Sequence, residues 1–236
     1  MDSKEKISLV LLPGMDGTGK LFAPLIALLP SYISPIVIIF PTTIKLSYQE
    51  LATLVQAQIP PDGPYILLGE SFSGPIAIAL AANANVHLKG LILTCTFAIN
   101  PRQFLSKFRI LVPCLPINAW SRPVLNQLLL ANFDSPALSQ YLYDVVSQVP
   151  PAVMRYRLDE VMQVDETVAL RKITQPILYL QAKNDYLVPP TAAQTILKLA
   201  QHAQIVALDA PHLLLQVATK AAVVQIEYFI NHTLKI

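Results

Sequence analysis

Short apolar runs recur along the chain and are separated by segments with the spacing of helices. Runs of this length, rich in β-branched residues and bounded by Pro or Gly, are typical of strands buried on both faces of a sheet. Six such runs lie at residues 7–12, 36–40, 65–68, 91–93, 177–180 and 205–208. They predict a compact sheet of about six mostly parallel strands.

Helical patterns fill the segments between these strands. Ser47 and Glu50 have the spacing of a capping box, which predicts a helix from there to about residue 59. Another helix is expected to end near Pro30, and two more cover residues 72–84 and 213–231. Alternating strands and helices predict an α/β fold with helices on both faces of the sheet.

Residues 101–172 interrupt this alternation. They contain several prolines and short apolar helical patterns but no convincing strand. About 70 residues are far more than one crossover between neighbouring strands needs. We therefore expect a core formed by residues 1–100 and 173–236, with a helical cap inserted between its fourth and fifth strands. Ordinary crossover helices are the alternative.

The composition narrows the class of protein. Charged residues make up 14% of the 236 residues, against about 25% in an average protein, and hydrophobic residues make up 53%. This excludes intrinsic disorder, which requires low hydrophobicity and high net charge. The formal net charge is only +2 and no basic run occurs, which argues against a nucleic-acid partner.

Several features indicate a cytoplasmic protein. Residues 1–6 are polar and do not begin a signal peptide. Residues 21–44 carry no charge and could span a bilayer, but four prolines favour a helix followed by a strand. Cys95 and Cys114 form neither a disulfide framework nor a metal-binding pair, and they suit a reducing cytosol. We expect no membrane span.

The strongest chemical signal follows the third predicted strand, where residues Gly69 to Gly74 read GESFSG and an Ala-rich helix begins. This strand–turn–helix resembles the nucleophile elbow of the α/β-hydrolase superfamily, in which a strained turn exposes a serine Oγ. The resemblance implies that Ser71 is a nucleophile. Positions two before and two after it must be small, and Gly69 and Ser73 are. A plain turn with an N-cap serine is the alternative.

A glycine-rich loop with the sequence LPGMDGTG follows the first strand at residues 12–19. It lacks the GxGxxG spacing of a dinucleotide-binding loop, and Gly19-Lys20 is followed by Leu21 rather than by the Ser or Thr of a Walker loop. In α/β-hydrolases this loop and the residue after the nucleophile supply the backbone N–H groups of the oxyanion hole. The resemblance therefore implies oxyanion donors at Met15 and Phe72.

Two further motifs follow the fifth and sixth predicted strands. Asp185 lies in the loop before Pro189, and His212 lies where the last strand meets the last helix. The order Ser71, Asp185, His212 resembles the nucleophile, acid and base order of the superfamily. These motifs should meet, because parallel strands end at one edge of the sheet. Asp209 could compete as the acid, but we expect it to form loop hydrogen bonds.

The resemblance covers nearly the whole chain and implies a serine hydrolase that needs no metal or organic cofactor. His212 would take the proton from Ser71, which attacks an ester or thioester carbonyl, while Asp185 orients the imidazole. The expected partner is a small-molecule or acyl-carrier ester. Acyl transfer or thioester hydrolysis by the same residues is one alternative. A non-catalytic ligand-binding protein of the same fold is another.

The sequences LPGMDGTG and GESFSG are similar to those of a group of small bacterial α/β-hydrolases. These proteins are similar to the carboxylesterase that acts on pimeloyl-carrier-protein methyl ester in biotin synthesis. That substrate would need basic residues on the cap. The candidates, which could instead only solvate an apolar insertion, are Arg102, Lys107, Arg109, Arg122, Arg155 and Arg157. Apolar cap residues are expected to line an acyl pocket or to pack on the sheet, namely Phe104, Phe108, Leu111, Leu115, Trp120, Leu128, Leu129 and Phe133. Among these, Trp120, Leu128 and Leu129 are the candidate substrate-binding residues.

Overall fold

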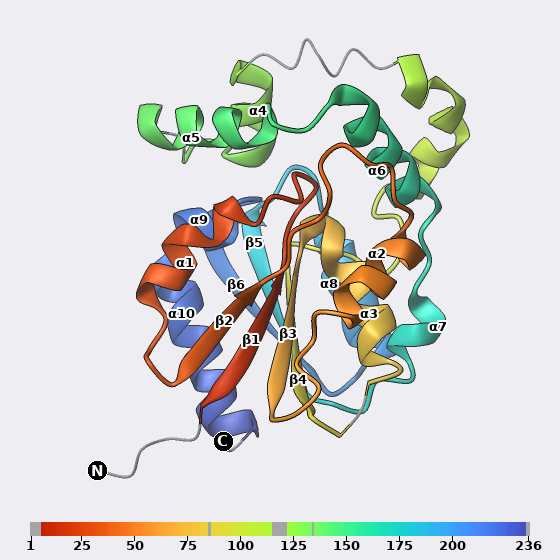
Figure 1. The fold of residues 1–236 in the computed structure, drawn as a ribbon. Helices are drawn as coiled ribbons and strands as arrows, with labels where there is room; N and C mark the ends of the chain where they lie inside the picture. The colour runs from red at the N-terminus through yellow and green to blue at the C-terminus, as the bar shows by residue number, and fades with distance from the viewer. Residues whose placement is uncertain (1–5, 85, 115–121, 134, 235–236) are drawn as a thin grey trace.

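A single parallel sheet runs through the centre of the molecule, and helices cover both of its faces (Figure 1). The computed structural model describes residues 6–84, 86–114, 122–133 and 135–234. The strands are β1 (Ile7–Leu12), β2 (Ile33–Val37), β3 (Tyr65–Glu70), β4 (Leu88–Thr94), β5 (Ile177–Asn184) and β6 (Ala203–Pro211). Their order is β2-β1-β3-β4-β5-β6, and every neighbouring pair is parallel. The predicted six-stranded sheet is confirmed.

One strand lies earlier in the sequence than predicted. The pattern placed it at residues 36–40, after Pro35, whereas β2 begins at Ile33 and contains that proline. Proline is tolerated there because β2 is an edge strand, which has one side free of ladder hydrogen bonds. The chain continues beside the sheet after β2, and the Phe40 N–H still donates to the Gly17 carbonyl at 2.8 Å.

The helices follow the predicted order. Those of the first half are η1 (Lys20–Phe22), α1 (Ala23–Leu28), α2 (Tyr48–Gln56), η2 (Ser71–Ser73) and α3 (Gly74–Ala81). After β5 come α8 (Pro190–Leu199), α9 (Leu214–Val217), α10 (Thr219–Tyr228) and η5 (Phe229–Leu234). The capping box of α2 is present, since the Glu50 N–H donates to Ser47 Oγ and Glu50 Oε2 accepts from the Ser47 N–H. The helix predicted at 213–231 is divided into α9, α10 and part of η5.

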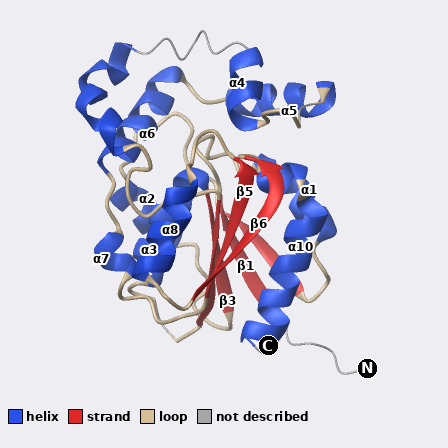
Figure 2. Ribbon diagram, turned by 180° about the vertical axis from the view of Figure 1, so that it is seen from behind, coloured by secondary structure: helices blue, strands red, loops and turns tan. Residues whose placement is uncertain are grey.

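Successive residues of the central strands point to opposite faces and build two cores. Leu9 of β1 packs in one core with Leu25 of α1 and Ile226 of α10. Val10 packs in the other with Leu51 of α2 and Ile76 of α3. Figure 2 shows α1 and α10 on one side of the sheet and α2, α3 and α8 on the other. This two-sided burial explains why the strands read as continuous apolar runs.

The segment between β4 and β5 is helical in the residues that the structure describes. It contains η3 (Gln103–Cys114), α4 (Arg122–Leu129), α5 (Pro136–Val146), α6 (Pro151–Gln163) and α7 (Thr167–Leu170). We call η3, α4, α5 and α6 the cap helices. α4, α5 and α6 lie over the carboxyl ends of the strands, whereas α7 packs beside the sheet against α3 and α8 (Figure 1).

The uncharged stretch at residues 21–44 contributes to η1, α1 and β2. Within the described ranges, no helix has both the length and the apolar character needed to cross a membrane.

Candidate active site

Ser71 lies at the sharp turn from β3 into η2 and α3. Its φ of 49° is in the left-handed region, which non-glycine residues rarely adopt. A Cβ added to Gly69 would lie 2.9 Å from the Ser73 carbonyl oxygen, and one added to Gly74 would lie 1.9 Å from Thr96 Oγ1. The strand and the helix therefore approach too closely for a side chain at Gly69, and the Thr96 side chain leaves no space for one at Gly74. This approach is the physical basis of the predicted elbow.

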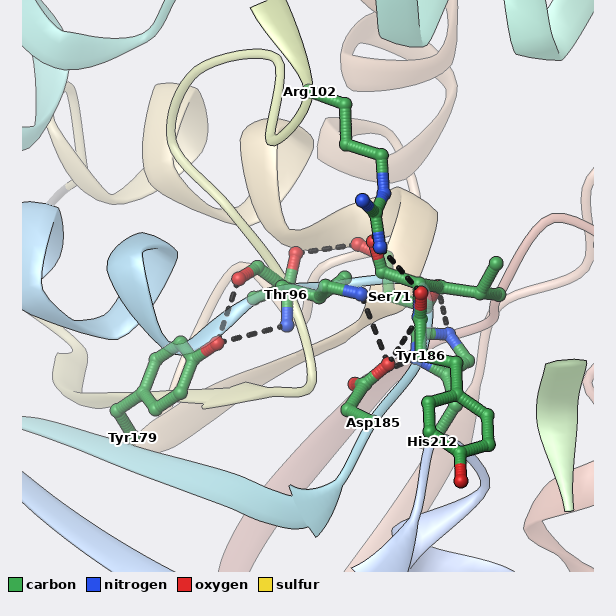
Figure 3. A network of polar contacts seen from close by, with 9 residues as sticks. Ser71, Thr96, Arg102, Tyr179, Asp185, Tyr186 and His212 are labelled. Carbon is green, nitrogen blue, oxygen red and sulfur yellow. Dashed lines mark hydrogen bonds and ion pairs between the residues drawn. The ribbon is translucent and has the colours of Figure 1, made fainter. Parts of the chain in front are cut away.

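A buried hydrogen-bond chain anchors the strained turn. Thr96 Oγ1 donates to the Ser71 carbonyl oxygen. The Tyr179 hydroxyl donates to the Thr96 carbonyl at 2.7 Å and accepts from the Thr96 N–H at 3.2 Å (Figure 3). Both supporting side chains are almost fully buried. No local pattern in the sequence marks Thr96 or Tyr179 as partners of Ser71.

The structure brings Ser71, His212 and Asp185 together in one hydrogen-bonded row (Figure 3). Ser71 Oγ lies 2.7 Å from His212 Nε2, and His212 Nδ1 lies 2.8 Å from Asp185 Oδ2. The other carboxylate oxygen, Asp185 Oδ1, accepts from the N–H groups of Leu187 and Val188 at 2.8 and 2.9 Å. The imidazole is thus held between a hydroxyl whose proton it can take and a carboxylate that is itself fixed by backbone donors.

Asp209 lies away from this row. Its side chain is exposed, and its Oδ1 accepts from Asn184 Nδ2 at 3.0 Å. Two of the remaining histidines, His202 and His232, are exposed and contact backbone carbonyls. Neither lies in the row that contains His212.

Buried acidic groups raise the pKa of the His212 imidazole. Burial alone would lower the pKa of His212, but the charge and hydrogen bond of Asp185 and the charge of Glu70 outweigh it, so the pKa is raised above its ordinary value. Burial raises the pKa of Glu70 from 4.5 to about 7, against the opposing hydrogen bond from Gln216. Glu70, directly before Ser71, therefore changes its charge near neutral pH.

The loop after β1 lies against the elbow. A Cβ added to Gly14 would be 3.9 Å from Ser71 Cβ. Ser73 Oγ donates to the carbonyl oxygen of Pro13, so this small residue of the turn holds the loop in place. Met15 and Phe72, the expected oxyanion donors, border one cavity with Ser71 and His212. Both residues thus border the same space as the serine and the imidazole.

Two apolar cavities meet at Ser71 and His212. Cavity A, of about 170 Å³, is lined by Gly14, Met15, Asp16, Leu21, Glu70, Ser71, Leu125, Leu129, Leu142, Val146, Met154, Leu158, Leu187, His212 and Leu213. Cavity B, of about 200 Å³, is lined by Met15, Ser71, Phe72, Phe97, Asn100, Pro101, Arg102, Leu105, Leu158, Val161, Met162, Leu187, Val188 and His212. The serine therefore has space for apolar groups on two sides.

The apolar cap residues named from the sequence divide into four groups. Leu129 lines cavity A, while Leu128 and Phe133 are not among the described residues that line either cavity. Trp120 and Leu115 lie outside the described residues. Three others, predicted to line an acyl pocket or to pack on the sheet, are more than half exposed, namely Phe104, Phe108 and Leu111.

The exposure of those three residues follows from the geometry of η3. In a 3₁₀-helix, residues three apart share a face. The face of Ser106, Arg109 and Val112 packs on α6, since Ser106 Oγ donates to the Met162 carbonyl at 3.2 Å and Arg109 pairs with Asp159 at 2.5 Å. Phe104, Phe108 and Leu111 occupy the other faces.

The basic cap residues also differ from expectation. Arg157 does not solvate the cap, because only 2% of it is exposed and its guanidinium bonds to backbone carbonyls. Arg102 donates to the carbonyls of Tyr186 and Leu187 (Figure 3). Lys107 is exposed, Arg155 borders a separate open groove, and the side chain of Arg122 lies outside the described residues. Contacts made by the long side chains decided these roles, and no sequence pattern indicated them.

No group of three or more His, Cys, Asp or Glu side chains arranged to hold a metal ion occurs among the described residues. The groups that meet at the site are a hydroxyl, an imidazole, carboxyls and backbone amides.

Several solved structures share the fold of this chain. An enol-lactonase from Burkholderia xenovorans LB400 is 16% identical, with a TM-score of 0.84 over 98% of this chain and 94% of the other. An esterase from Exiguobacterium antarcticum is 14% identical, with a TM-score of 0.83 over 96% and 92%. A lipase-esterase related protein from Clostridium acetobutylicum ATCC 824 is 18% identical, with a TM-score of 0.77 over 96% and 95%. At these identities the similarity supports the fold alone.

A search of curated proteins found no match. The sequence does match the family model described as "Alpha/beta hydrolase family" over residues 9–226, a span that runs from β1 to α10 and includes Ser71, Asp185 and His212. The protein therefore belongs to the alpha/beta hydrolase family.

Proposed function

We propose that the protein is a serine hydrolase that cleaves carboxylic esters or thioesters through an acyl-enzyme on Ser71. The observation that carries this proposal is the row from Ser71 Oγ through His212 to Asp185, with contacts of 2.7 and 2.8 Å. Its position at the junction of two apolar cavities supports an acyl substrate rather than a phosphate. The names esterase and enol-lactonase of two structures with this fold are consistent with ester chemistry.

The proposed reaction has two halves. His212 Nε2 takes the Ser71 proton as Oγ attacks the carbonyl carbon, and Asp185 stabilises the imidazolium that forms. The N–H groups of Met15 and Phe72 stabilise the oxyanion. His212 then gives the proton to the leaving alcohol or thiol, and it activates a water molecule that releases the acid and regenerates Ser71.

The two cavities indicate the class of substrate. Both are lined mainly by aliphatic and aromatic side chains, so each accepts an apolar group attached to the ester. We assign the acyl chain to cavity A, which the cap residues Leu125 and Leu129 line. Two buried carboxyl groups, Asp16 and Glu70, also border this cavity, so an anionic group close to the scissile carbonyl is disfavoured there.

Replacement of the nucleophile tests the proposal directly. Ser71→Ala should lower kcat for p-nitrophenyl esters by about 10⁴-fold, because the loss of a triad member removes most of the catalysis. The wild type should react covalently with a fluorophosphonate, and the variant should not. The unfolding midpoint in urea should stay close to that of the wild type, as the control for folding.

Residual activity of more than a few per cent in Ser71→Ala would contradict the proposal. Absence of fluorophosphonate labelling of the wild type would instead favour a ligand-binding protein. A panel of acyl chains from C2 to C16, with an acyl-carrier ester and an added alcohol or amine as acceptor, separates ester hydrolysis from thioester hydrolysis and acyl transfer.

Asp185 and Asp209, the two candidates for the triad acid, provide a matched pair of substitutions. Asp185→Asn should lower kcat by about 10³- to 10⁴-fold, because the carboxylate that orients and stabilises the imidazole is lost. Asp209→Asn should retain kcat within about twofold, since Asp209 is exposed and contacts only a neighbouring strand through Asn184. Steady-state kinetics of both variants decide the assignment. A greater loss in Asp209→Asn would show that the wrong acid was chosen.

The pH dependence follows from the charges around the imidazole. His212 acts as a base only when neutral, and its pKa is raised, so kcat/KM should increase with pH along a limb centred above pH 6.5. Glu70→Gln removes a negative charge that stabilises the imidazolium, so the limb should move to lower pH. Asp62→Asn, which changes an exposed loop carboxylate, should leave the limb in place. An unmoved limb in Glu70→Gln would refute this coupling.

Chain-length preference should reside in cavity A. Leu129→Trp fills part of the cavity, so it should lower kcat/KM for long acyl chains and leave acetyl esters almost unchanged. Burial of four methylenes corresponds to about two orders of magnitude in kcat/KM, at about 0.8 kcal/mol for each. Leu128→Trp is the control, since the adjacent Leu128 does not line the cavity. Equal losses at every chain length, or a change confined to the alcohol group, would contradict the assignment.

A further inference from the structure

We propose that Arg157 is a positioning residue of this active site, which reaches from α6 to the loop after β1 and holds the Met15 N–H in the oxyanion hole. The proposal rests on the function proposed above. Among the described residues, Arg157 is the only arginine that is fully buried. The proposal explains this burial by a role in the reaction.

The guanidinium of Arg157 joins two loops of the core. Nη1 donates to the carbonyl oxygen of Met15 at 2.7 Å, and Nη2 donates to that of Pro41 at 2.9 Å. Its Cζ lies 6.0 Å from the centre of the Phe40 ring. Burial of a charge is costly unless it is satisfied by hydrogen bonds, and a lysine could not span both carbonyls with the planar geometry of arginine. The residue type therefore matches this bridging contact.

These contacts constrain the proposed donor on both sides. The Gly14 carbonyl accepts from the Gly17 N–H at 3.0 Å, which fixes the peptide between Gly14 and Met15. In a planar trans peptide the N–H points away from the C=O, so this bond directs the Met15 N–H to the opposite side. Arg157 fixes the following peptide through the Met15 carbonyl. The donor thus lies between two anchored carbonyls.

The loop sequence is adapted to the guanidinium. Gly17 has a φ of 72°, and a Cβ there would lie 2.7 Å from Arg157 Nη1 and 3.0 Å from Phe40 Cβ. Glycine is required at this position by both the backbone conformation and the space that Arg157 occupies.

The same helix is linked to the second proposed donor through Tyr48. Glu160 Oε2 accepts from the Tyr48 N–H at 2.9 Å, and the Tyr48 ring stacks on the ring of Phe72 with centroids 4.7 Å apart. Leu158 of α6 lines both cavities. α6 therefore borders the substrate space, contacts the loop of Met15 directly and is linked to Phe72 through Tyr48.

The test is the kinetics of Arg157→Met and Arg157→Lys on a propionyl ester. Complete loss of one oxyanion donor lowers kcat by about 10²- to 10³-fold, and misalignment should cost less. We expect kcat to fall about 10- to 100-fold in Arg157→Met with KM within about twofold, and an intermediate loss in Arg157→Lys. The concentration of active enzyme is determined by titration with a fluorophosphonate, and kcat is calculated from that concentration. Unfolded protein therefore does not lower the kcat of a variant.

A pair of inhibitors separates positioning from a merely structural role. A trifluoromethyl ketone forms a charged adduct with serine that occupies the oxyanion hole, whereas the corresponding carbinol stays uncharged. The Ki of the ketone should rise by the same factor as kcat/KM falls, and the Ki of the carbinol should not change. Arg171→Met, which alters an exposed arginine beyond α7, should leave both Ki values and kcat unchanged.

The inference is overturned if titrated Arg157→Met has a kcat within twofold of the wild type, or if both Ki values rise together. If Arg157→Met does not fold, the same comparison in Arg157→Lys decides, because that variant keeps the charge and one donor. Failure of the underlying function has a different signature, namely activity that survives in Ser71→Ala.

Discussion

At Ser71 the backbones of β3 and α3 approach so closely that Gly69 has no space for a Cβ, and the Thr96 side chain packs directly against Gly74. The serine is held at a φ of 49° by this approach and by the hydrogen bond from Thr96 to its carbonyl. Such strain persists only where the surroundings over-determine the conformation. The other parts of the site are arranged around this fixed point, including the loop after β1, which Ser73 ties to the elbow.

The parallel sheet explains why the remaining groups reach the serine. β1, β3, β5 and β6 end at the same edge, and the loops after them carry Met15, Ser71, Asp185 and His212. The carboxylate of Asp185 is buried, and its two N–H donors and the imidazole satisfy it. A buried charge of this kind stabilises an imidazolium without itself needing to move.

The cap helices do more than cover the carboxyl ends of the strands. α6 lines both cavities, its Arg157 bonds to the Met15 carbonyl, and its Glu160 accepts from Tyr48, whose ring stacks on Phe72. Under the proposed function, specificity and catalysis share one helix. A substitution that shifts α6 would then alter both substrate preference and the stabilisation of the oxyanion, whereas a substitution in α4 would alter preference alone.

Local sequence patterns predict most of the strands and the three residues that meet at the candidate site. The apolar runs predicted six parallel strands, because strands buried on both faces are apolar throughout, and the motifs after them named Ser71, Asp185 and His212. The start of β2 was placed after Pro35, because the pattern did not identify β2 as an edge strand, where proline is tolerated. The roles of Thr96, Tyr179 and Arg157 were beyond prediction, since each depends on a partner 25 or more residues away. Periodicity and short motifs determine strands, turns and reactive residues, whereas only tertiary packing decides which long side chain reaches which distant carbonyl.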